Sequence, residues 1–184
     1  MQKFLKAEVK TLKTYYVNWH GPYTYENIRD SVHCSAEKPK DLSQNGLYVF
    51  IGKKKYAHSR LLQYVGITEG SFQDRFYQHH KREGINRELS IWLGKIIAPK
   101  RHDRGGLETV EHMLTYFTQP SLNEKKTCTP PTISCAVISR FYFAKSNTLR
   151  KRIPLLLQDI PDVMLWDHDH ERFHYSGRLN DYTI

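Results

Sequence analysis

Two short apolar segments separated by a polar connection constrain the fold of this chain more than any other feature of its sequence. Residues 46–51 read Gly-Leu-Tyr-Val-Phe-Ile and residues 61–67 read Leu-Leu-Gln-Tyr-Val-Gly-Ile. Both segments are rich in the β-branched and aromatic side chains that strands favour. The basic, polar residues 53–59 join them, and two strands joined by such a loop most simply pair as an antiparallel hairpin.

Helices and strands alternate after this hairpin. A helix is predicted over about 72–82, because Ser71 is a suitable N-cap and Phe72 and Phe76 recur at helical spacing. Residues 90–97 are predicted to form a third strand. The remaining predicted elements are a basic loop at 99–106, a helix at 107–118 with Val110, Leu114 and Phe117 on its apolar stripe, ended by Pro120, a strand at 133–144, a partly helical stretch at 149–159 and short strands at 163–166 and 173–175.

The fold class predicted from this pattern is α+β, with the order β-β-α-β-α from residue 46 onward. Before it, residues 1–19 alternate loosely as a strand does, residues 24–29 indicate a short helix and residues 34–45 indicate a loop. A length of 184 residues with 39% apolar side chains suits one compact domain with a core of its own. We therefore expect residues 1–184 to form a single domain.

The charge of the chain favours a polyanionic partner. Lysine and arginine total 28 against 19 acidic residues, which gives a formal charge of +9 at pH 7. Nucleic acid fits this excess better than a membrane surface, because no basic amphipathic helix with a clear apolar face is visible. No apolar run is long enough to cross a bilayer, and residues 1–13 lack the apolar core of a signal peptide, so we expect a cytoplasmic protein. Cys34, Cys128 and Cys135 form no metal-binding spacing, and we expect reduced thiols.

Six polar residues stand in or after the hairpin in an order that resembles the GIY-YIG nuclease family. The two tripeptides that name the family read here Gly46-Leu47-Tyr48 and Tyr64-Val65-Gly66, with Leu47 and Val65 as apolar exchanges of the family isoleucines. Glu111 and Asn123 are 12 residues apart with Pro120 between them, a spacing similar to that of excision-repair nucleases and some restriction enzymes of the family. The six residues are Tyr48, Tyr64, Arg75, His79, Glu111 and Asn123.

This resemblance covers residues 46–123 and implies a small core whose antiparallel or mixed sheet is flanked by helices. Residues 1–45 and 124–184 are then extensions of that core, and the second extension is a candidate DNA-recognition or dimer element. The implied activity is one-step hydrolysis of a DNA phosphodiester bond that leaves 5′-phosphate and 3′-hydroxyl ends.

The residues themselves are compatible with that chemistry. Arg75 and His79, four positions apart, share one helix face, and the planar guanidinium suits a phosphate. Glu111 offers the hard oxygen that Mg²⁺ prefers, and Mn²⁺ can substitute. Glu108, one turn earlier, is the rival ligand.

The resemblance also implies a role for each residue. Tyr48 or Tyr64 activates the water, with Tyr48 preferred as the base, and Arg75 stabilises the charge on the phosphate. Because the ordinary pKa of tyrosine is about 10, a base at neutral pH needs a lowered pKa, which we expect from Arg75 and the metal. His79 then assists by hydrogen bonding or proton transfer, Glu111 holds a single Mg²⁺ and Asn123 braces the helix that carries it.

The six residues are expected to lie at one cleft, and basic residues around it are predicted to contact the DNA backbone. They are Lys53, Lys54, Lys55, Lys81, Arg82, Lys100, Arg101 and Arg104. A second polar cluster, residues 162–171, contains four acidic residues and two histidines, and a turn is favoured there over a metal site.

A chain of this size resembles the small type II restriction endonucleases of the family, which act on double-stranded DNA as homodimers or higher homo-oligomers. Three alternatives stay open: a non-cleaving nucleic-acid-binding module on the same fold, a repair or structure-specific nuclease, and an RNA-directed nuclease. Each site residue also has an ordinary structural interpretation, as a core aromatic, a surface charge or a turn residue.

Overall fold

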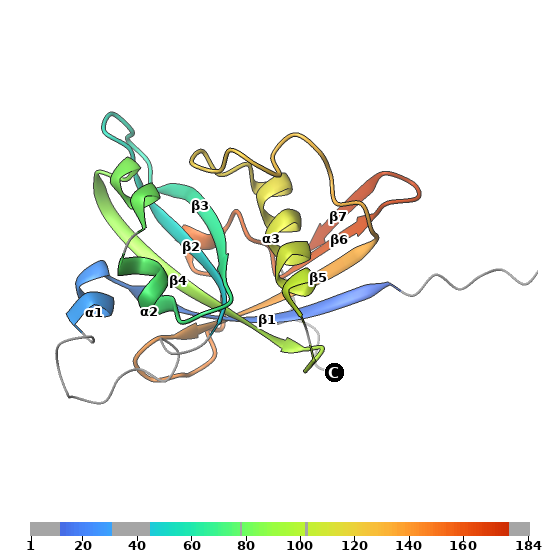
Figure 1. Ribbon diagram of the computed structural model, residues 1–184, viewed down its shortest axis with the longest axis horizontal. Coiled ribbons are helices and arrows are strands. Elements are labelled where there is room, and N and C mark those ends of the chain that lie inside the picture. The colour runs from blue at the N-terminus through green and yellow to red at the C-terminus, as the bar shows by residue number, and fades with distance from the viewer. Residues whose placement is uncertain (1–11, 31–44, 78, 102, 177–184) are drawn as a thin grey trace, which may run out of the picture.

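A seven-stranded, strongly curled sheet organises the molecule, and it curves into a half-barrel. The computed structural model describes residues 12–30, 45–77, 79–101 and 103–176 (Figure 1). The strand order is β3-β2-β4-β1-β5-β6-β7. The strands are β1 (Lys13–Tyr23), β2 (Gly46–Lys53), β3 (Leu61–Thr68), β4 (Arg87–Ala98), β5 (Cys135–Phe143), β6 (Val163–Asp167) and β7 (Arg172–Ser176).

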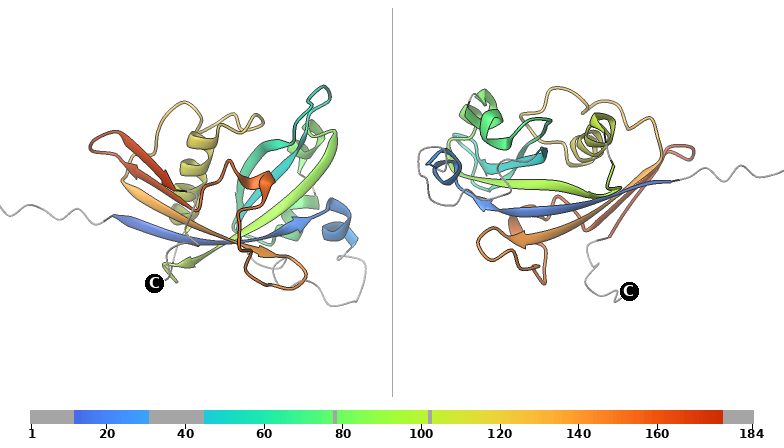
Figure 2. Two further views of the ribbon diagram at one scale, coloured as in Figure 1. Left: turned by 180° about the vertical axis from the view of Figure 1, so that it is seen from behind. Right: turned by 60° about the horizontal axis from the view of Figure 1, so that its bottom comes forward.

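Three short α-helices accompany the sheet, and only one has more than two turns. They are α1 (Tyr25–Asp30), α2 (Phe72–Tyr77) and α3 (Arg104–Thr118), with 3₁₀ turns at η2 (His80–Gly84) and η3 (Leu155–Leu157). The predicted α+β class is thereby confirmed. Helix α3 lies in the hollow of the curled sheet, between the arm formed by β2 and β3 and the arm formed by β6 and β7 (Figure 2).

The predicted hairpin is confirmed, because β2 and β3 pair antiparallel with Tyr48 opposite Gly66. Strand β4 pairs antiparallel with β2 on one side and with β1 on the other. Strand β1 in turn pairs parallel with β5, which makes the sheet mixed. Strands from both predicted extensions therefore continue the sheet of residues 46–123.

Two predicted element boundaries, at α2 and α3, are wrong. The helix predicted over 72–82 stops at Tyr77, because His79 is extended (φ −84°, ψ 91°) and a 3₁₀ turn follows it. The loop predicted over 99–106 is too long, since α3 begins at Arg104. Asp103 caps that helix by accepting a hydrogen bond from the backbone N–H of Gly106, so a pair of glycines that indicated a loop forms its first turn.

The sheet separates two apolar clusters. One lies between the sheet and α3 and contains Trp19, Leu47 and Val110, with Phe117 packed against it and stacked 3.7 Å from the ring of Phe173. The other lies under α1 and α2 and is largely aromatic, with Tyr48, Phe50, Phe72, Phe76 and Leu93 among its members. Successive side chains of β2 point alternately into the two clusters, as a strand with two covered faces requires.

The cysteines that the structure describes are free thiols. Cys135 is buried, with its Sγ 3.9 Å from the sulfur of Met113, and Cys128 is exposed. Cys34 lies outside the described residues, as do residues 1–11 of the predicted first strand and most of the loop predicted at 34–45. Within the described part, no helix combines the length and the apolar character needed to span a membrane.

Gly94 is the position where β4 leaves room for a buried tryptophan. It lies opposite Trp19 in the sheet, and a Cβ atom there would stand 2.6 Å from Cζ3 of that ring. We expect Gly94→Ala to lower the free energy of unfolding by about 1–3 kcal/mol, the usual cost of overpacking a core. Urea unfolding followed by tryptophan fluorescence measures this change.

Gly70→Ala is the matched control, because a Cβ at Gly70 would meet no atom within 4 Å. Its effect should stay within about 0.5 kcal/mol. Equal effects of the two substitutions would contradict the steric role of Gly94.

Candidate active site

A buried tyrosine hydroxyl joins Arg75 and His79. Tyr48, on β2, is fully buried, and its hydroxyl lies 2.7 Å from Nε2 of His79. The Nε–H group of Arg75, on α2, donates a hydrogen bond of 3.0 Å to the same oxygen. Phe76 packs edge-on against the Tyr48 ring, with 5.0 Å between the centroids. Tyr48 therefore contacts both Arg75 and His79, but the prediction that these two share one helix face is wrong, because α2 ends before His79.

Gly66 makes the placement of Tyr48 possible. The two residues face each other across β2 and β3, and a Cβ at Gly66 would stand 2.6 Å from Cζ and from the hydroxyl oxygen of Tyr48. Any larger residue would push the ring away from Arg75. The glycine of the second tripeptide thus has a steric role in the site.

Tyr64 occupies a different position from Tyr48. It lies on β3, the edge strand, is half-buried and forms part of the wall of an open cleft. The Tyr48 and Tyr64 rings are 5.9 Å apart. Of the two tyrosines, Tyr64 is therefore the one that solvent or a ligand in the cleft can reach.

The pKa values around Tyr48 are shifted by burial. Burial raises the pKa of Tyr48 well above its usual value, and the neighbouring Tyr64 adds to the rise; Arg75 lowers it, but by less. The expectation that Arg75 lowers the pKa of Tyr48 below its ordinary value is therefore wrong, because burial outweighs the effect of Arg75. Burial also lowers the pKa of His79 to about 4, helped by the positive charges of Arg75 and His80. The hydrogen bond to Tyr48 raises the pKa of Arg75, which keeps it charged.

Glu111 faces the same cleft from α3. Its side chain is 15% exposed, and Nζ of Lys126 lies 2.5 Å from its Oε2. Glu108 is more open, with 43% of its side chain exposed, and it pairs with Arg104 at 2.7 Å. Both carboxylates line the cleft, but Glu111 is the more enclosed one.

Asn123 joins the segment after α3 to the edge of the sheet. Its Oδ1 accepts a hydrogen bond from the backbone N–H of Val65 (2.9 Å), and its Nδ2 donates to the Val65 carbonyl (2.8 Å). The backbone N–H of Leu122 donates to the Gln63 carbonyl nearby, at 2.8 Å. Asn123 therefore occupies the free edge of β3 as a neighbouring strand would, and it holds the strand that carries Tyr64.

The cleft has a volume of about 620 Å³ and runs along β3, between α2 on one side and α3 on the other. Tyr64, Arg75, Glu111 and Asn123 line it, and Tyr48 and His79 lie directly behind Arg75. Its walls carry both signs of charge. The acidic side chains are Glu69, Glu108, Glu111 and Glu124, and the basic ones are Arg75, Lys81, Arg104, Lys125 and Lys126.

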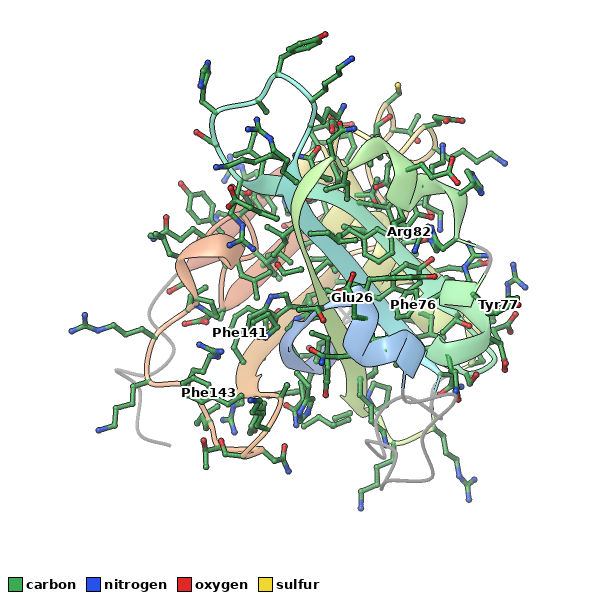
Figure 3. The ribbon with its side chains drawn as sticks, turned by 90° about the vertical axis from the view of Figure 1, so that its left-hand side faces the viewer. Glu26, Phe76, Tyr77, Arg82, Phe141 and Phe143 are labelled. Atoms are coloured by element: carbon green, nitrogen blue, oxygen red, sulfur yellow. The ribbon has the colours of Figure 1, made fainter. Side chains whose placement is uncertain are left out.

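Only some of the basic residues predicted to bind DNA lie at this cleft. Lys81 and Arg104 line it, whereas Lys100 and Arg101 lie in the exposed connection between β4 and α3. Arg82 stacks on the ring of Tyr25, 3.8 Å from its centroid, on the side of the molecule where α1 lies (Figure 3).

The three lysines of the hairpin connection lie away from the cleft walls. Lys53 pairs with Glu88 at 2.6 Å, at the base of the β2–β3 turn. Lys54 and Lys55 lie in the turn itself, which projects beyond the rest of the sheet (Figure 1).

Within the acidic and histidine-rich segment at 162–171, residues 163–167 form β6 and residues 168–171 form the turn to β7. Asp167 accepts hydrogen bonds from the backbone N–H of Asp169 and from Nδ1 of His170. No group of three potential metal ligands occurs among the described residues, here or in the cleft. The turn role that the sequence favoured therefore applies to the end of this cluster, from Asp167 onward, whereas Asp162 is buried before β6.

Lys125 and Lys126 are cleft residues that sequence reasoning missed. They directly follow Glu124, two and three residues after Asn123, and a basic pair so close to a predicted site residue was the available signal. No family model, curated protein or solved structure matches this chain.

The lowered pKa of His79 can be measured directly. The imidazole signals of His79, assigned with a His79→Gln variant, should titrate with a midpoint of about 4 and stay neutral at pH 7 in an NMR titration. At pH values between about 4 and about 6.5, His79 binds a proton in the unfolded chain but not in the folded protein. The contribution of His79 to stability is thus complete above about pH 6.5 and lost as the pH falls towards 4. A midpoint near 6.5 would show that the ring is not enclosed as described.

Proposed function

We propose that this protein is a metal-dependent endonuclease of the GIY-YIG type that hydrolyses double-stranded DNA. The observation that carries the proposal concerns the six residues singled out by their resemblance to the family pattern: four of them line one cleft, and Tyr48 and His79 lie directly behind Arg75. The six residues come from β2, β3, α2, α3 and the segments that follow the two helices. The order β-β-α-β-α within residues 46–118 also agrees with the fold that the resemblance implies.

Arg75 is the proposed phosphate-binding residue. Its Nε–H is used by the Tyr48 hydroxyl, and a guanidinium has four further N–H donors. Because Arg75 lies in the cleft wall with one side fixed, those donors are oriented before the phosphate arrives. Tyr48 and His79 act here as positioning residues for Arg75.

Tyr64 is the proposed contact of the attacking water, and it replaces Tyr48 in that role. Tyr48 is fully buried and its pKa is raised, whereas Tyr64 reaches the cleft. The water oxygen attacks phosphorus while the Tyr64 hydroxyl accepts its proton and releases its own to solvent. The bond from phosphorus to O3′ breaks, and the leaving oxygen takes up a proton from solvent, which gives 5′-phosphate and 3′-hydroxyl ends.

Glu111 is the proposed ligand of Mg²⁺. A carboxylate oxygen that faces an open cleft fits this ion, which takes few protein ligands and keeps several waters. The metal would supply neutralisation of charge at the leaving oxygen. Glu108 is the weaker candidate because Arg104 already pairs with it at a more exposed position.

A site-specific type II restriction enzyme is the form of nuclease we favour. Strands β1, β5, β6 and β7 extend the catalytic sheet directly, so the elements available for recognising DNA are rigidly attached to the cleft. A palindromic site would then be read by two copies related by two-fold symmetry.

Cleavage of plasmid and phage DNA tests the function. With Mg²⁺ we expect discrete fragments, and with EDTA none. Glu111→Ala should lower the rate by about a hundredfold or more, because the metal loses its protein ligand. Glu108→Ala is the matched control, one helical turn away, and should stay within about threefold of the parent rate.

Other outcomes identify the alternatives. Nicking or smearing would retain the nuclease and argue against restriction, and cleavage of structured RNA alone would indicate an RNA-directed enzyme. Salt-sensitive DNA binding without any cleavage would indicate a binding module.

Phenylalanine substitutions separate the two tyrosines. Tyr64→Phe should lower the cleavage rate by about a hundredfold with little change in DNA affinity, because it removes only the hydroxyl that contacts the water. Tyr48→Phe should weaken DNA binding as well, because it releases Arg75. Single-turnover cleavage and equilibrium binding in Ca²⁺ report the two quantities. A fully active Tyr64→Phe variant would return the base role to Tyr48.

A further inference from the structure

Lys126 lies at the carboxylate proposed to hold the metal. Its Nζ is 2.5 Å from Oε2 of Glu111, and both side chains are partly enclosed, with 31% and 15% of their areas exposed. An ammonium and a divalent cation repel each other and cannot occupy the same side of one carboxylate oxygen. A metal that binds Oε2 must therefore displace this lysine.

The backbone around Lys126 is fixed on both sides, so the side chain is the part that can move. Asn123 holds the preceding residues on Val65, and Nε2 of Gln119 donates a 2.9 Å hydrogen bond to the Thr127 carbonyl. Lys126 itself has a left-handed backbone conformation (φ 64°), which is uncommon for a residue other than glycine. The neighbouring residues hold this backbone conformation. The flexible four-carbon side chain of Lys126 extends from it into the cleft, towards Glu111.

The other carboxylates of the cleft are paired in the same way. Glu69 and Glu108 share Arg104, and Glu124 pairs with Lys81. The cleft is thus largely neutralised by its own side chains. What distinguishes the pair of Lys126 and Glu111 is that its acidic member is the proposed metal ligand.

We propose that Lys126 occupies the cation site on Glu111 in the metal-free protein. When a divalent metal binds Glu111, it displaces the ammonium group of Lys126, which then contacts a phosphate of the bound DNA. The inference rests on the proposed function, because it takes Glu111 as the metal ligand. Lys126 would then be a second phosphate-binding cation, beside Arg75, that becomes available only when the metal is bound. Metal binding and phosphate binding are coupled through this one side chain.

Direct Mn²⁺ binding to the DNA-free protein tests the first half. Titrations followed by the electron paramagnetic resonance signal of free Mn²⁺ should show about fivefold tighter binding for Lys126→Met, because no ion pair has to be broken. Lys125→Met is the matched control, since it removes the same charge from the neighbouring residue of the same cleft, and it should change the affinity by less than about twofold. Glu111→Gln should lose the site.

DNA binding tests the second half. The affinity for a duplex is measured against salt concentration, with Ca²⁺ in place of Mg²⁺ and again in EDTA. In Ca²⁺, Lys126→Met should reduce the salt dependence by about one phosphate contact. In EDTA the slope should equal that of the parent protein, because Lys126 is then held on Glu111.

The outcomes keep this inference apart from the proposed function. Unchanged Mn²⁺ affinity in Lys126→Met, or an equal gain in Lys125→Met, would overturn the role of Lys126 while Mg²⁺-dependent cleavage stands. A Mn²⁺ site that survives Glu111→Gln would overturn the metal role of Glu111, and the inference with it. Thermal unfolding of each variant, and a parallel Lys126→Gln variant, show whether a result reflects loss of the fold.

Discussion

The hydroxyl group of Tyr48 is the constraint on which the rest of the site depends. It is fully buried in an aromatic cluster, where an unpaired hydroxyl would be costly, and it is satisfied by Arg75 and His79. To supply both partners, α2 stops after Tyr77 and the chain turns His79 inwards in an extended conformation. The short helix is thus a consequence of placing two side chains on one buried oxygen. Gly66 completes the arrangement by leaving room for the ring.

The free edge of β3 determines where the cleft lies. An edge strand exposes unpaired backbone groups, and here Asn123 and Leu122 cover part of that edge from the segment after α3. Because β3 also carries Tyr64, these contacts couple the position of Tyr64 to α3, the helix that carries Glu111. The cleft forms where these two elements approach each other across the edge of the sheet. Residues far apart in the chain are in this way brought to one surface.

The charges of the cleft explain why a basic protein has a nearly neutral site. Its carboxylates contact lysine or arginine side chains, while other cations of the chain are used elsewhere: Lys53 on Glu88, and Arg82 on the ring of Tyr25. The exposed pairs among them, such as Glu69 and Glu108 with Arg104, contribute little to stability. Under the proposed function, metal and DNA would each replace one member of an existing pair. The overall charge of +9 would then serve the proposed function mainly by attracting the polyanion.

The sequence by itself determined the elements and their order. The hairpin at residues 46–68, helix α3 and the late strands follow from periodicities of two and 3.6 residues and from local caps, which are properties of neighbouring residues. The six polar positions were visible through their resemblance to the pattern of the GIY-YIG family. Only the tertiary structure decided that Tyr48 is buried with a raised pKa, that Tyr64 faces the cleft, and that Lys126 lies on Glu111. Burial and long-range ion pairs depend on how the sheet curls and on which segments cover its edges, and no local pattern in the chain records either.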